Sequence, residues 1–433
     1  MLYYLMRKNE EITLAQFSPN GEMESFNREL LREHIDIAPF EVRSPKSSLI
    51  KWWNDRAVPV GQGGVREMLR KNGCTTPSEF LIRNLGLSLT DYYWIRPTDS
   101  DLTWEQVNLY DNDFGQNRFE SSLFASSPAK SAQYSPNSSL QGQIEKTWAM
   151  IGGERYLVKG NHSDVSRESL NEVFASLIHK RQGYDNFTPY RLIHIKNKPY
   201  EYGCCSRQFT DERKELVSAY AVILTGKRRN DQSYKECLIE TLGNNGMDTK
   251  QLRKDLDYEI MTDFLLSGYD RHLTNIALLR DADTLQFTRM APIFDSGGCL
   301  YAGIAFPNSE SELLRLRTAG FNRREEPLVK SVRDYSCVDL TRLPAVSELR
   351  ALYAKDRRID PYTIEHVGIV YEKKIDLCRE LQLGRHIYAK ISLNTPKIEH
   401  AEKQDEPKDF DDILMTVPEP EKHGSSGHGK RSS

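Results

Sequence analysis

The chain has 433 residues, with 59 Lys and Arg side chains against 62 Asp and Glu side chains, which gives a formal net charge of −3 at pH 7. This near balance argues against broad electrostatic capture of nucleic acid or of an anionic membrane, so a site for a polyanion must be local. The longest apolar runs are far shorter than the ~20 residues that cross a bilayer, and the first residues do not resemble a secretory leader, so we expect no membrane partner.

The cysteines indicate the compartment. There are seven of them, with no C-x-x-C spacing and one adjacent pair. An odd number without that spacing predicts neither a disulfide framework nor a zinc site. We therefore expect a reduced, cytoplasmic protein.

Residues 1–130 are predicted to form an N-terminal accessory region of mixed secondary structure. Ile12 to Phe17 has the composition of a strand and runs into a tight turn, and apolar side chains between Ser48 and Gly86 recur near helical spacing. Nothing in this region indicates catalysis. Four aromatic residues are expected to belong to the core rather than to a binding surface: Tyr92, Tyr93, Trp94 and Trp104.

Residues 131–210 are predicted to form a small β-rich lobe that carries one helix. Two alternating segments flank Gly152-Gly153 and predict a hairpin, Ile144 to Met150 with Arg155 to Lys159. An apolar stripe from Leu170 to Ile178 then predicts a helix that ends at Gly183. Two further strands are expected at residues 191–195 and 202–209, the second leading into a hinge at Cys204 to Phe209.

Residues 211–391 are predicted to form a larger, mainly helical lobe, so the fold class is α+β with a two-lobed layout. Helices are expected at residues 212–224, 250–266, 309–318, 345–356 and 361–382, and a second hairpin at residues 276–279 and 285–294. Beyond them, residues 392–433 are acidic and then rich in Gly and Ser, which predicts a disordered tail.

The strongest candidate site follows the predicted helix that ends near Gly268. Asp270 and Asn275 lie five positions apart in a polar loop, and the next hairpin ends at Asp295. Phosphoryl transfer to a hydroxyl uses such a set: Asp270 would orient or deprotonate the acceptor, Asn275 and Asp295 would hold Mg²⁺, and His272 would bind a phosphate oxygen or hold the loop. The alternative is that these residues only cap helices and turns.

The sequence of this segment resembles that of a known family. Asp270-x-His272-x-x-Asn275 followed by Phe294-Asp295-x-Gly is similar to the catalytic loop and metal-binding aspartate of HipA-like serine/threonine kinases, the toxin kinases of bacterial toxin–antitoxin modules. This resemblance implies a two-lobed protein-kinase-like fold, with ATP and Mg²⁺ as cofactors. The same loop also resembles that of phosphatidylinositol-3-kinase-like enzymes, so protein and lipid acceptors both stay open.

Upstream, Ser139-Leu-Gln-Gly142 is similar to the phosphate-loop segment of that family, and Lys159 stands where its nucleotide lysine would be. The resemblance also implies that Ser139 can be autophosphorylated, which silences the family's enzymes. The alternative is an ordinary loop serine. As a phosphate loop, residues 135–143 are a weak signal, because Gly142 is their single glycine.

The hairpin turn also fixes which lysines face each other. If Gly152 and Gly153 are the two turn residues, Lys146 is directly opposite Lys159. Opposed like charges destabilise a sheet, so a bound anion such as a nucleotide triphosphate would explain the pair. The alternative is that both lysines spread into solvent at the sheet edge.

Glu172 has two interpretations. Asn171-Glu172 is similar to the family's helix motif, which implies that Glu172 orients the nucleotide lysine. On a helical wheel, however, Glu172 falls opposite the apolar stripe of Leu170 and Phe174, which is typical of a solvated surface residue.

Together these patterns predict an ATP- and Mg²⁺-dependent kinase that transfers the γ-phosphate to serine or threonine of a protein. One alternative is a lipid or small-molecule kinase of the same fold, and another is an inactive nucleotide-binding regulator. By family analogy a translation factor is a candidate substrate and an antitoxin is a candidate partner. No helix-turn-helix or basic arm indicates direct nucleic-acid binding.

Overall fold

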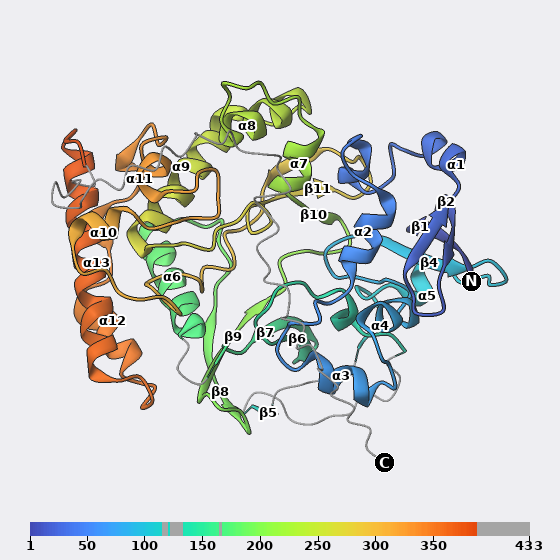
Figure 1. Ribbon diagram of the computed structural model, residues 1–433, viewed down its shortest axis with the longest axis horizontal. Coiled ribbons are helices and arrows are strands. Elements are labelled where there is room, and N and C mark those ends of the chain that lie inside the picture. Colours follow the sequence, from blue (N-terminus) through green and yellow to red (C-terminus); the bar gives the residue numbers. More distant parts are fainter. Residues whose placement is uncertain (115–119, 122–132, 164–166, 388–433) are drawn as a thin grey trace, which may run out of the picture. The chain divides into compact units, whose positions relative to one another are not determined.

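The computed structural model describes residues 1–114, 120–121, 133–163 and 167–387, and these belong to one compact unit (Figure 1). The predicted tail at residues 392–433 lies outside the described residues. Strands and helices alternate along the chain, and the strands of the described residues form three sheets of four, five and three strands. The fold is therefore a mixed α/β fold.

The first sheet is built from the N-terminal region. Its strands are β1 (Leu2–Arg7), β2 (Glu10–Phe17), β3 (Met23–Phe26) and β4 (Tyr93–Pro97), antiparallel in the order β3-β2-β1-β4. Between β3 and β4 lie α1 (Arg28–Glu33), η1 (Phe40–Arg43), α2 (Leu49–Arg56), α3 (Val65–Lys71) and α4 (Pro77–Arg83), and α5 (Trp104–Val107) follows β4. The expected strand and short helices are confirmed, and all four aromatic residues that were expected in the core are buried.

The second sheet carries the predicted hairpin. Its strands are β5 (Glu120–Ser121), β6 (Lys146–Ile151), β7 (Glu154–Lys159), β8 (Arg191–Lys196) and β9 (Tyr202–Arg207), in the order β5-β8-β9-β7-β6. The short 3-10 helix η2 (Pro136–Ser139) precedes it, and α6 (Glu168–Gln182) packs against β8 and β9. Gly152 and Gly153 form the turn, so Lys146 is paired with Lys159 as the turn geometry predicted.

The third sheet contains β10 (Lys214–Ser218), β11 (Ala277–Asp281) and β12 (Phe287–Met290), which are antiparallel. Around it lie α7 (Ala219–Thr225), α8 (Tyr234–Asn244), α9 (Thr249–Leu266), α10 (Glu310–Leu314), α11 (Glu325–Val329), η3 (Tyr335–Cys337), η4 (Leu340–Arg342), α12 (Val346–Tyr353) and α13 (Pro361–Gln382). None of the described helices is long and apolar enough to cross a bilayer.

Two sequence predictions are corrected here. The helix expected at residues 212–224 begins only at Ala219, because residues 214–218 pair with β11 along their whole length. The hinge expected at Cys204 to Phe209 also starts later, since Cys204 lies inside β9 and is paired with Lys159. The link to β10 therefore begins at Gln208.

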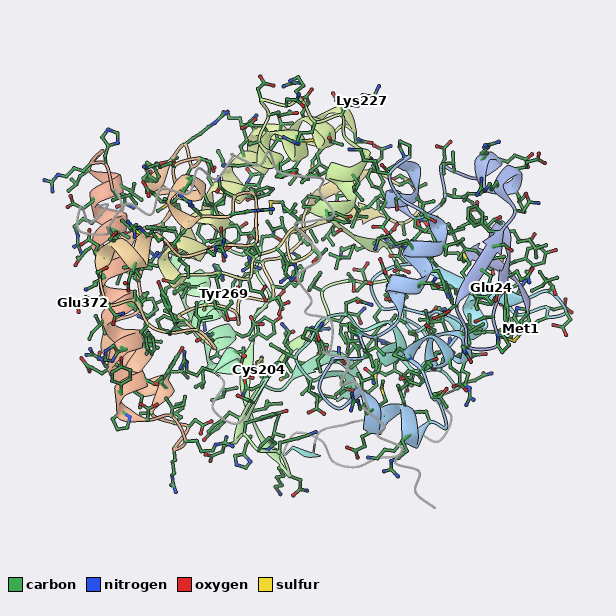
Figure 2. The ribbon with its side chains drawn as sticks, viewed as in Figure 1. Met1, Glu24, Cys204, Lys227, Tyr269 and Glu372 are labelled. Carbon is green, nitrogen blue, oxygen red and sulfur yellow. The ribbon has the colours of Figure 1, made fainter. Side chains whose placement is uncertain are left out.

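The N-terminal region is joined to the rest of the unit through hydrogen bonds at the third sheet. The backbone N–H of Leu216 donates to the carbonyl of Thr90 at 2.8 Å, and the Tyr92 hydroxyl donates to the carbonyl of Asp211 at 2.8 Å. Figure 2 shows Tyr269 and Cys204 among the packed side chains, whereas Lys227 and Glu372 are exposed.

Candidate active site

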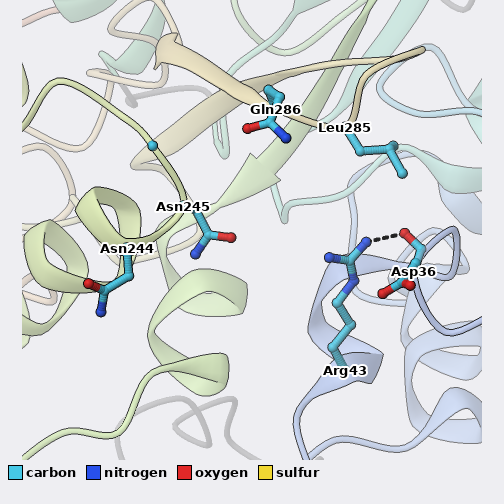
Figure 3. A pocket seen from close by; sticks show the side chains of 7 residues that line it. Asp36, Arg43, Asn244, Asn245, Leu285 and Gln286 are labelled. Atoms are coloured by element: carbon cyan, nitrogen blue, oxygen red, sulfur yellow. Dashed lines mark hydrogen bonds between the residues drawn. The ribbon is translucent and has the colours of Figure 1, made fainter.

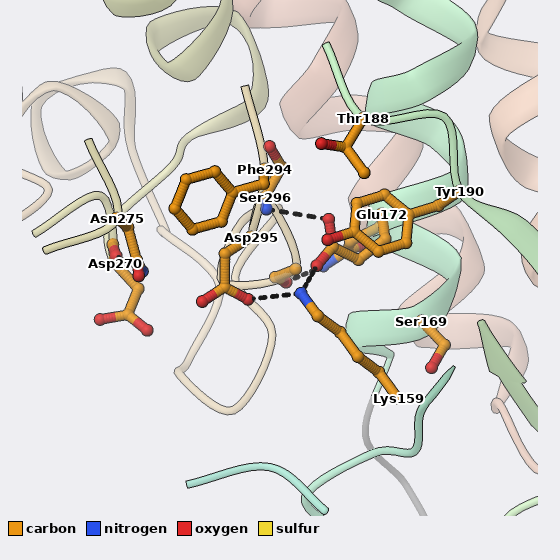
Figure 4. Close-up of polar contacts among 12 residues, drawn as sticks. Lys159, Ser169, Glu172, Thr188, Tyr190, Asp270, Asn275, Phe294, Asp295 and Ser296 are labelled. Atoms are coloured by element: carbon orange, nitrogen blue, oxygen red, sulfur yellow. Dashed lines mark hydrogen bonds and ion pairs between the residues drawn. The ribbon is translucent and has the colours of Figure 1, made fainter. Parts of the chain in front are cut away.

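A buried lysine lies at the centre of the candidate site (Figure 4). Lys159 Nζ is 2.6 Å from Glu172 Oε1 and 2.7 Å from Asp295 Oδ1, and it stands 4.8 Å from the centre of the Tyr190 ring. Its side chain is only 4% exposed. Burial alone would lower the pKa of Lys159, but the charges of Asp295 and Glu172 outweigh it and hold that pKa well above the ordinary value. Lys159 is therefore a permanent cation.

Glu172 connects this lysine to the loop after β12. Its side chain is 3% exposed, and its second oxygen, Oε2, accepts a hydrogen bond of 2.9 Å from the backbone N–H of Ser296. The surface interpretation of Glu172 is therefore wrong. The wheel failed because α6 is buried on both faces: the apolar stripe meets apolar neighbours, and the opposite face meets Lys159 and the Asp295 loop.

Asp295 is held by its backbone as well as by Lys159. Its φ of 57° is left-handed, an uncommon conformation for a non-glycine residue that the surrounding contacts must maintain. Burial would raise the pKa of its carboxyl, but Lys159 and Lys146 outweigh that effect and hold the pKa well below the usual range. Asp295 is therefore ionised at neutral pH.

Arg271 stabilises the Asp295 loop through hydrogen bonds, a role that the sequence did not reveal. Its guanidinium donates to the carbonyl of Phe294 and, at 2.8 Å, to Ser296 Oγ. It also forms an ion pair with Asp263 of α9 at 3.0 Å. Its place beside Asp270 was the one signal for Arg271 in the sequence. The arginine links α9, the loop of Asp270 and the loop of Asp295.

The three residues predicted in the loop after α9 lie together. The backbone N–H of His272 donates to the carbonyl of Asp270 at 2.9 Å, and Asn275 Nδ2 donates to the same carbonyl at 3.1 Å. Because the amide nitrogen of Asn275 makes this hydrogen bond, the amide oxygen Oδ1 is the atom that can act as a ligand or acceptor. His272 Nδ1 makes a hydrogen bond with Thr274 Oγ1, which fixes the orientation of the imidazole ring.

The environment of Asp270 differs from that of Asp295. Although the residue is partly exposed, desolvation by the surrounding protein raises the pKa of its carboxyl and outweighs the opposing effect of His272, and the negative charge of Asp295 adds a smaller increase. A carboxylate whose pKa is raised is a stronger base. Asp270 is thus the carboxylate of this site that is suited to accept a proton.

The oxygen ligands of this site fit Mg²⁺. In Figure 4, Asp270 and Asn275 lie on the side of Asp295 away from Lys159. Two carboxylates and one amide oxygen are hard donors, and Mg²⁺ bound with a nucleotide needs only one or two protein carboxylates besides phosphates and water. Among the described residues no group of three or more His, Cys, Asp and Glu side chains forms a complete metal site of its own.

Lys146 is the second cation of the site. Its side chain faces the same region as Lys159, its cross-strand neighbour, and the residue is 7% exposed, so the predicted alternative of a solvated lysine at the sheet edge is wrong. Burial lowers its pKa, and the charge of Asp295 partly offsets that effect. Within the described ranges no acceptor lies within hydrogen-bond distance of its ammonium group. An anion would supply the missing partner.

The predicted phosphate loop ends next to Lys146. A methyl group on Gly142 would lie 2.5 Å from Lys146 Nζ, and the φ of Gly142 is +102°. The positive φ favours glycine at this position, and any larger residue would also require the Lys146 ammonium group to move. Further back in the loop, the half-buried Ser139 donates its hydroxyl hydrogen to the carbonyl of Leu87 at 2.8 Å, and Ser138 is fully buried.

Comparisons with known proteins find solved structures to which the chain is similar. No protein-family profile and no curated protein matches the chain. The chain is similar to the proinflammatory kinase CtkA of Helicobacter pylori, with 18% identity, a TM-score of 0.41, and coverage of 56% of this chain and 96% of CtkA.

It is also similar to HipA of the Shewanella oneidensis MR-1 toxin–antitoxin system, solved in complex with HipB and operator DNA, with 12% identity, a TM-score of 0.47, and coverage of 88% of this chain and 98% of HipA. The resemblance to HipA that the sequence motifs predicted is thus found again among solved structures.

Proposed function

We propose that the protein is a kinase that uses ATP and Mg²⁺ to phosphorylate serine or threonine of a protein target. The observation that carries this proposal is the buried contact of Lys159 with both Glu172 and Asp295, beside an aspartate of raised pKa, Asp270. A buried lysine, two carboxylates of opposite pKa shift and an amide oxygen are the groups that phosphoryl transfer to a hydroxyl needs.

Each side chain has a distinct role in the proposed reaction. Lys159 and Lys146 bind phosphate oxygens, and Glu172 keeps Lys159 in place. The acceptor hydroxyl attacks the γ-phosphorus while its proton passes to Asp270, a new O–P bond forms, and the bond from the γ-phosphorus to the bridging oxygen breaks to release ADP.

Asn275 and Asp295 would hold Mg²⁺, which when bound supplies positive charge to the phosphates. His272 orients the loop in which Asp270 stands, since its backbone and ring hydrogen bonds both lie within residues 270–275.

The protein acceptor and the partner also belong to this proposal. The HipA structure contains HipB and operator DNA. By analogy we propose an antitoxin-like partner for this chain and a translation factor as its target. Co-purification of the chain with the product of a neighbouring reading frame would support the partner.

A phosphate-transfer assay tests the proposal. Full-length protein is incubated with γ-labelled ATP, Mg²⁺ and a bacterial lysate, beside the variant Asp270→Asn. We expect transfer to lysate protein to fall at least about 100-fold in the variant, because general base catalysis contributes ~100- to 10,000-fold. The matched control is Asp376→Asn, at an exposed aspartate of α13, which should transfer as the wild type does.

The other outcomes of this assay decide between the alternatives. Label confined to the lipid fraction would indicate a lipid kinase, and nucleotide binding without any transfer by the wild type would indicate an inactive regulator. Label on the protein itself would be mapped to peptides, and we propose Ser139 as the modified residue. An unmodified peptide 135–143 would contradict that assignment.

A further inference from the structure

The phosphate loop is bound along its length to a segment of the N-terminal region, residues 55–63, which we call the clamp segment. The backbone N–H of Val58 donates to the carbonyl of Ser138 at 2.8 Å, and the backbone N–H of Gly63 donates to the carbonyl of Gln143 at 3.0 Å. These two bonds fix both halves of the loop. The sequence offered no sign of this contact, because the two segments lie about 80 residues apart.

Gln62 of the clamp segment holds the part of the loop nearest to the proposed phosphates. Its side chain is buried, with the residue 3% exposed, and Nε2 donates to the carbonyls of Leu140 and Gly142, both at 2.9 Å. Both hydrogens of the amide are thereby used. Gln62 therefore fixes the backbone on either side of Gln141.

Gln141 makes the reciprocal contact from the loop to the clamp segment. Its Nε2 lies 2.9 Å from the carbonyl oxygen of Arg56 and 3.1 Å from those of Asp55 and Ala57. These carbonyls stand at the C-terminal end of α2, where a helix has no partners of its own for its last carbonyl groups. Each segment thus satisfies backbone groups that the other leaves open.

The fastened loop meets the site at Gly142. Lys146 Nζ lies 2.5 Å from the position that a Cβ on Gly142 would take, and Lys146 in turn lies within electrostatic reach of Asp295 and Lys159. The position of the loop backbone relative to the two lysines is therefore set by Gln62 and Gln141, which themselves touch neither lysine in the described structure.

We infer that the clamp segment is a positioning element for nucleotide phosphates, and that Gln62 and Gln141 hold the phosphate loop in its binding conformation before the nucleotide arrives. This inference rests on the proposed function. A loop of nine residues that is free in the unbound protein would lose conformational entropy when phosphates order it, and a loop that is already fastened avoids this cost. The N-terminal region thereby contributes to nucleotide affinity without touching the nucleotide.

The test compares two ligands on the full-length chain by isothermal titration calorimetry: the Mg²⁺ complex of the non-hydrolysable ATP analogue AMP-PNP, and adenosine, which has no phosphates. Gln62→Met and Gln141→Met remove the amide donors at nearly constant volume. For each variant we expect AMP-PNP affinity to fall about three- to tenfold, the range of one or two lost hydrogen bonds, with adenosine affinity unchanged. Gln251→Met, at an exposed glutamine of α9, is the matched control.

Steady-state kinetics adds a readout that a general loss of stability would not give. In both variants the KM for ATP should rise by the same factor while kcat at saturating ATP stays at the wild-type value. Gln141 is exposed, so Gln141→Met remains informative if Gln62→Met does not fold.

Unchanged AMP-PNP affinity in Gln141→Met would overturn the inference, and so would an equal loss of affinity for adenosine. A wild type that binds both ligands but transfers no phosphate would instead contradict the proposed function. The effect of the clamp segment on AMP-PNP affinity would still be measured in that case. A wild type that binds neither ligand would overturn both.

Discussion

At the scale of single residues, two aspartates of one site are driven to opposite protonation behaviour. Lys159 and Lys146 hold the pKa of Asp295 well below the ordinary value, whereas desolvation and the charge of Asp295 raise the pKa of Asp270. Environments that separate the pKa values of neighbouring carboxyls separate their roles. Asp295 stays ionised and can bind a cation, whereas Asp270 is able to accept a proton.

This difference predicts the pH dependence of phosphate transfer. A base acts in its ionised form, so the rate should rise with pH through the pKa of Asp270, which lies above the ordinary aspartate value of 3.8. The positive charge of Lys146 lowers that pKa, so Lys146→Met should raise it and move the acid limb of the rate profile to higher pH. The measurement is kcat against pH at saturating ATP.

The control for this profile is Lys373→Met, at an exposed lysine of α13, which should leave the acid limb in place. An acid limb that stays fixed in Lys146→Met, or moves to lower pH, would contradict the electrostatic coupling between Lys146 and Asp270.

The sequence predicted the site unevenly at this scale. Local patterns can be deduced from the amino-acid sequence. Two examples are the spacing of Asp270 and Asn275 and the register of Lys146 against Lys159. The contact of Lys159 with Asp295 joins residues 136 positions apart, and no pattern in the sequence predicted it. Gln62 donates to backbone carbonyls, which carry no signature in the sequence, and Arg271 contacts groups as far away in the chain as Ser296.

At the scale of elements, α6 connects the second sheet to the loop after β12 that contains Asp295. Asn171 Nδ2 donates to the carbonyls of Gly297 and Cys299, both at 2.8 Å, and its Oδ1 accepts from the hydroxyl of Tyr353. Glu172 reaches Lys159 from the next position. One turn of helix therefore places the lysine of β7 and the loop of Asp295 relative to each other.

The close approach of the loop after Asp295 to the loop of Asp270 predicts the effect of a single methyl group. A Cβ on Gly298 would lie 2.5 Å from the Cβ of Asp270, so Gly298→Ala must displace the proposed base. We expect phosphate transfer to fall at least about tenfold, because small misplacements of a reacting group are costly, with the affinity for Mg²⁺–AMP-PNP within twofold of the wild type.

Gly384→Ala is the control for a general loss of stability, since its φ of +71° strains an alanine while a Cβ there meets no atom within 4 Å, and it should transfer phosphate as the wild type does. Transfer by Gly298→Ala at the wild-type rate would show that Asp270 is not held in place by this contact, or is not the base.

The elements that sequence reasoning missed have a common physical cause. Residues 214–218 were expected to be helical, yet they form β10 because β11 lies beside them with a complete set of backbone partners. Glu172 was open to a surface interpretation because a helical wheel registers apolar neighbours but not a buried ion pair. In contrast α9 and α13, whose apolar faces repeat over many turns, begin and end within one residue or so of the predicted positions.

At the scale of the whole molecule, a buried ion pair joins the N-terminal region to the third sheet. Arg280 of β11 is fully buried and lies 2.7 Å from Glu215 of β10, and it also donates to the hydroxyl of Tyr93 in β4 at 3.1 Å. The polar pocket of Figure 3 lies at the boundary of the same two regions, with Arg43 and Asp36 on one side and Asn245 and Gln286 on the other. The predicted accessory region is thus packed against the proposed catalytic unit.

This junction predicts how the unit unfolds. Tyr93→Phe removes a partner from the buried guanidinium of Arg280, and we expect the free energy of unfolding to fall by about 1–3 kcal/mol. All five tryptophans lie at or before position 148, so their fluorescence reports on the N-terminal part, while circular dichroism reports on all helices. Both denaturation curves should shift together, because the junction is shared.

The control is Tyr362→Phe, at a tyrosine that is 62% exposed, which should leave both curves unchanged. A shift in the fluorescence curve alone would mean that the N-terminal region unfolds independently of the helices beyond it.

The hydrogen bond from Ser139 to the carbonyl of Leu87 has a kinetic consequence. If Ser139 is modified as proposed, a hydroxyl held in this way, next to a fully buried Ser138, would meet a phosphate donor only during the fraction of time in which the loop has left the N-terminal region. If opening and closing are fast, the rate of modification at Ser139 equals that fraction multiplied by the rate of the open state. A bound nucleotide that stabilises the closed loop would then slow modification of the same chain, so self-modification would be slowest in the molecules most ready to act on another protein.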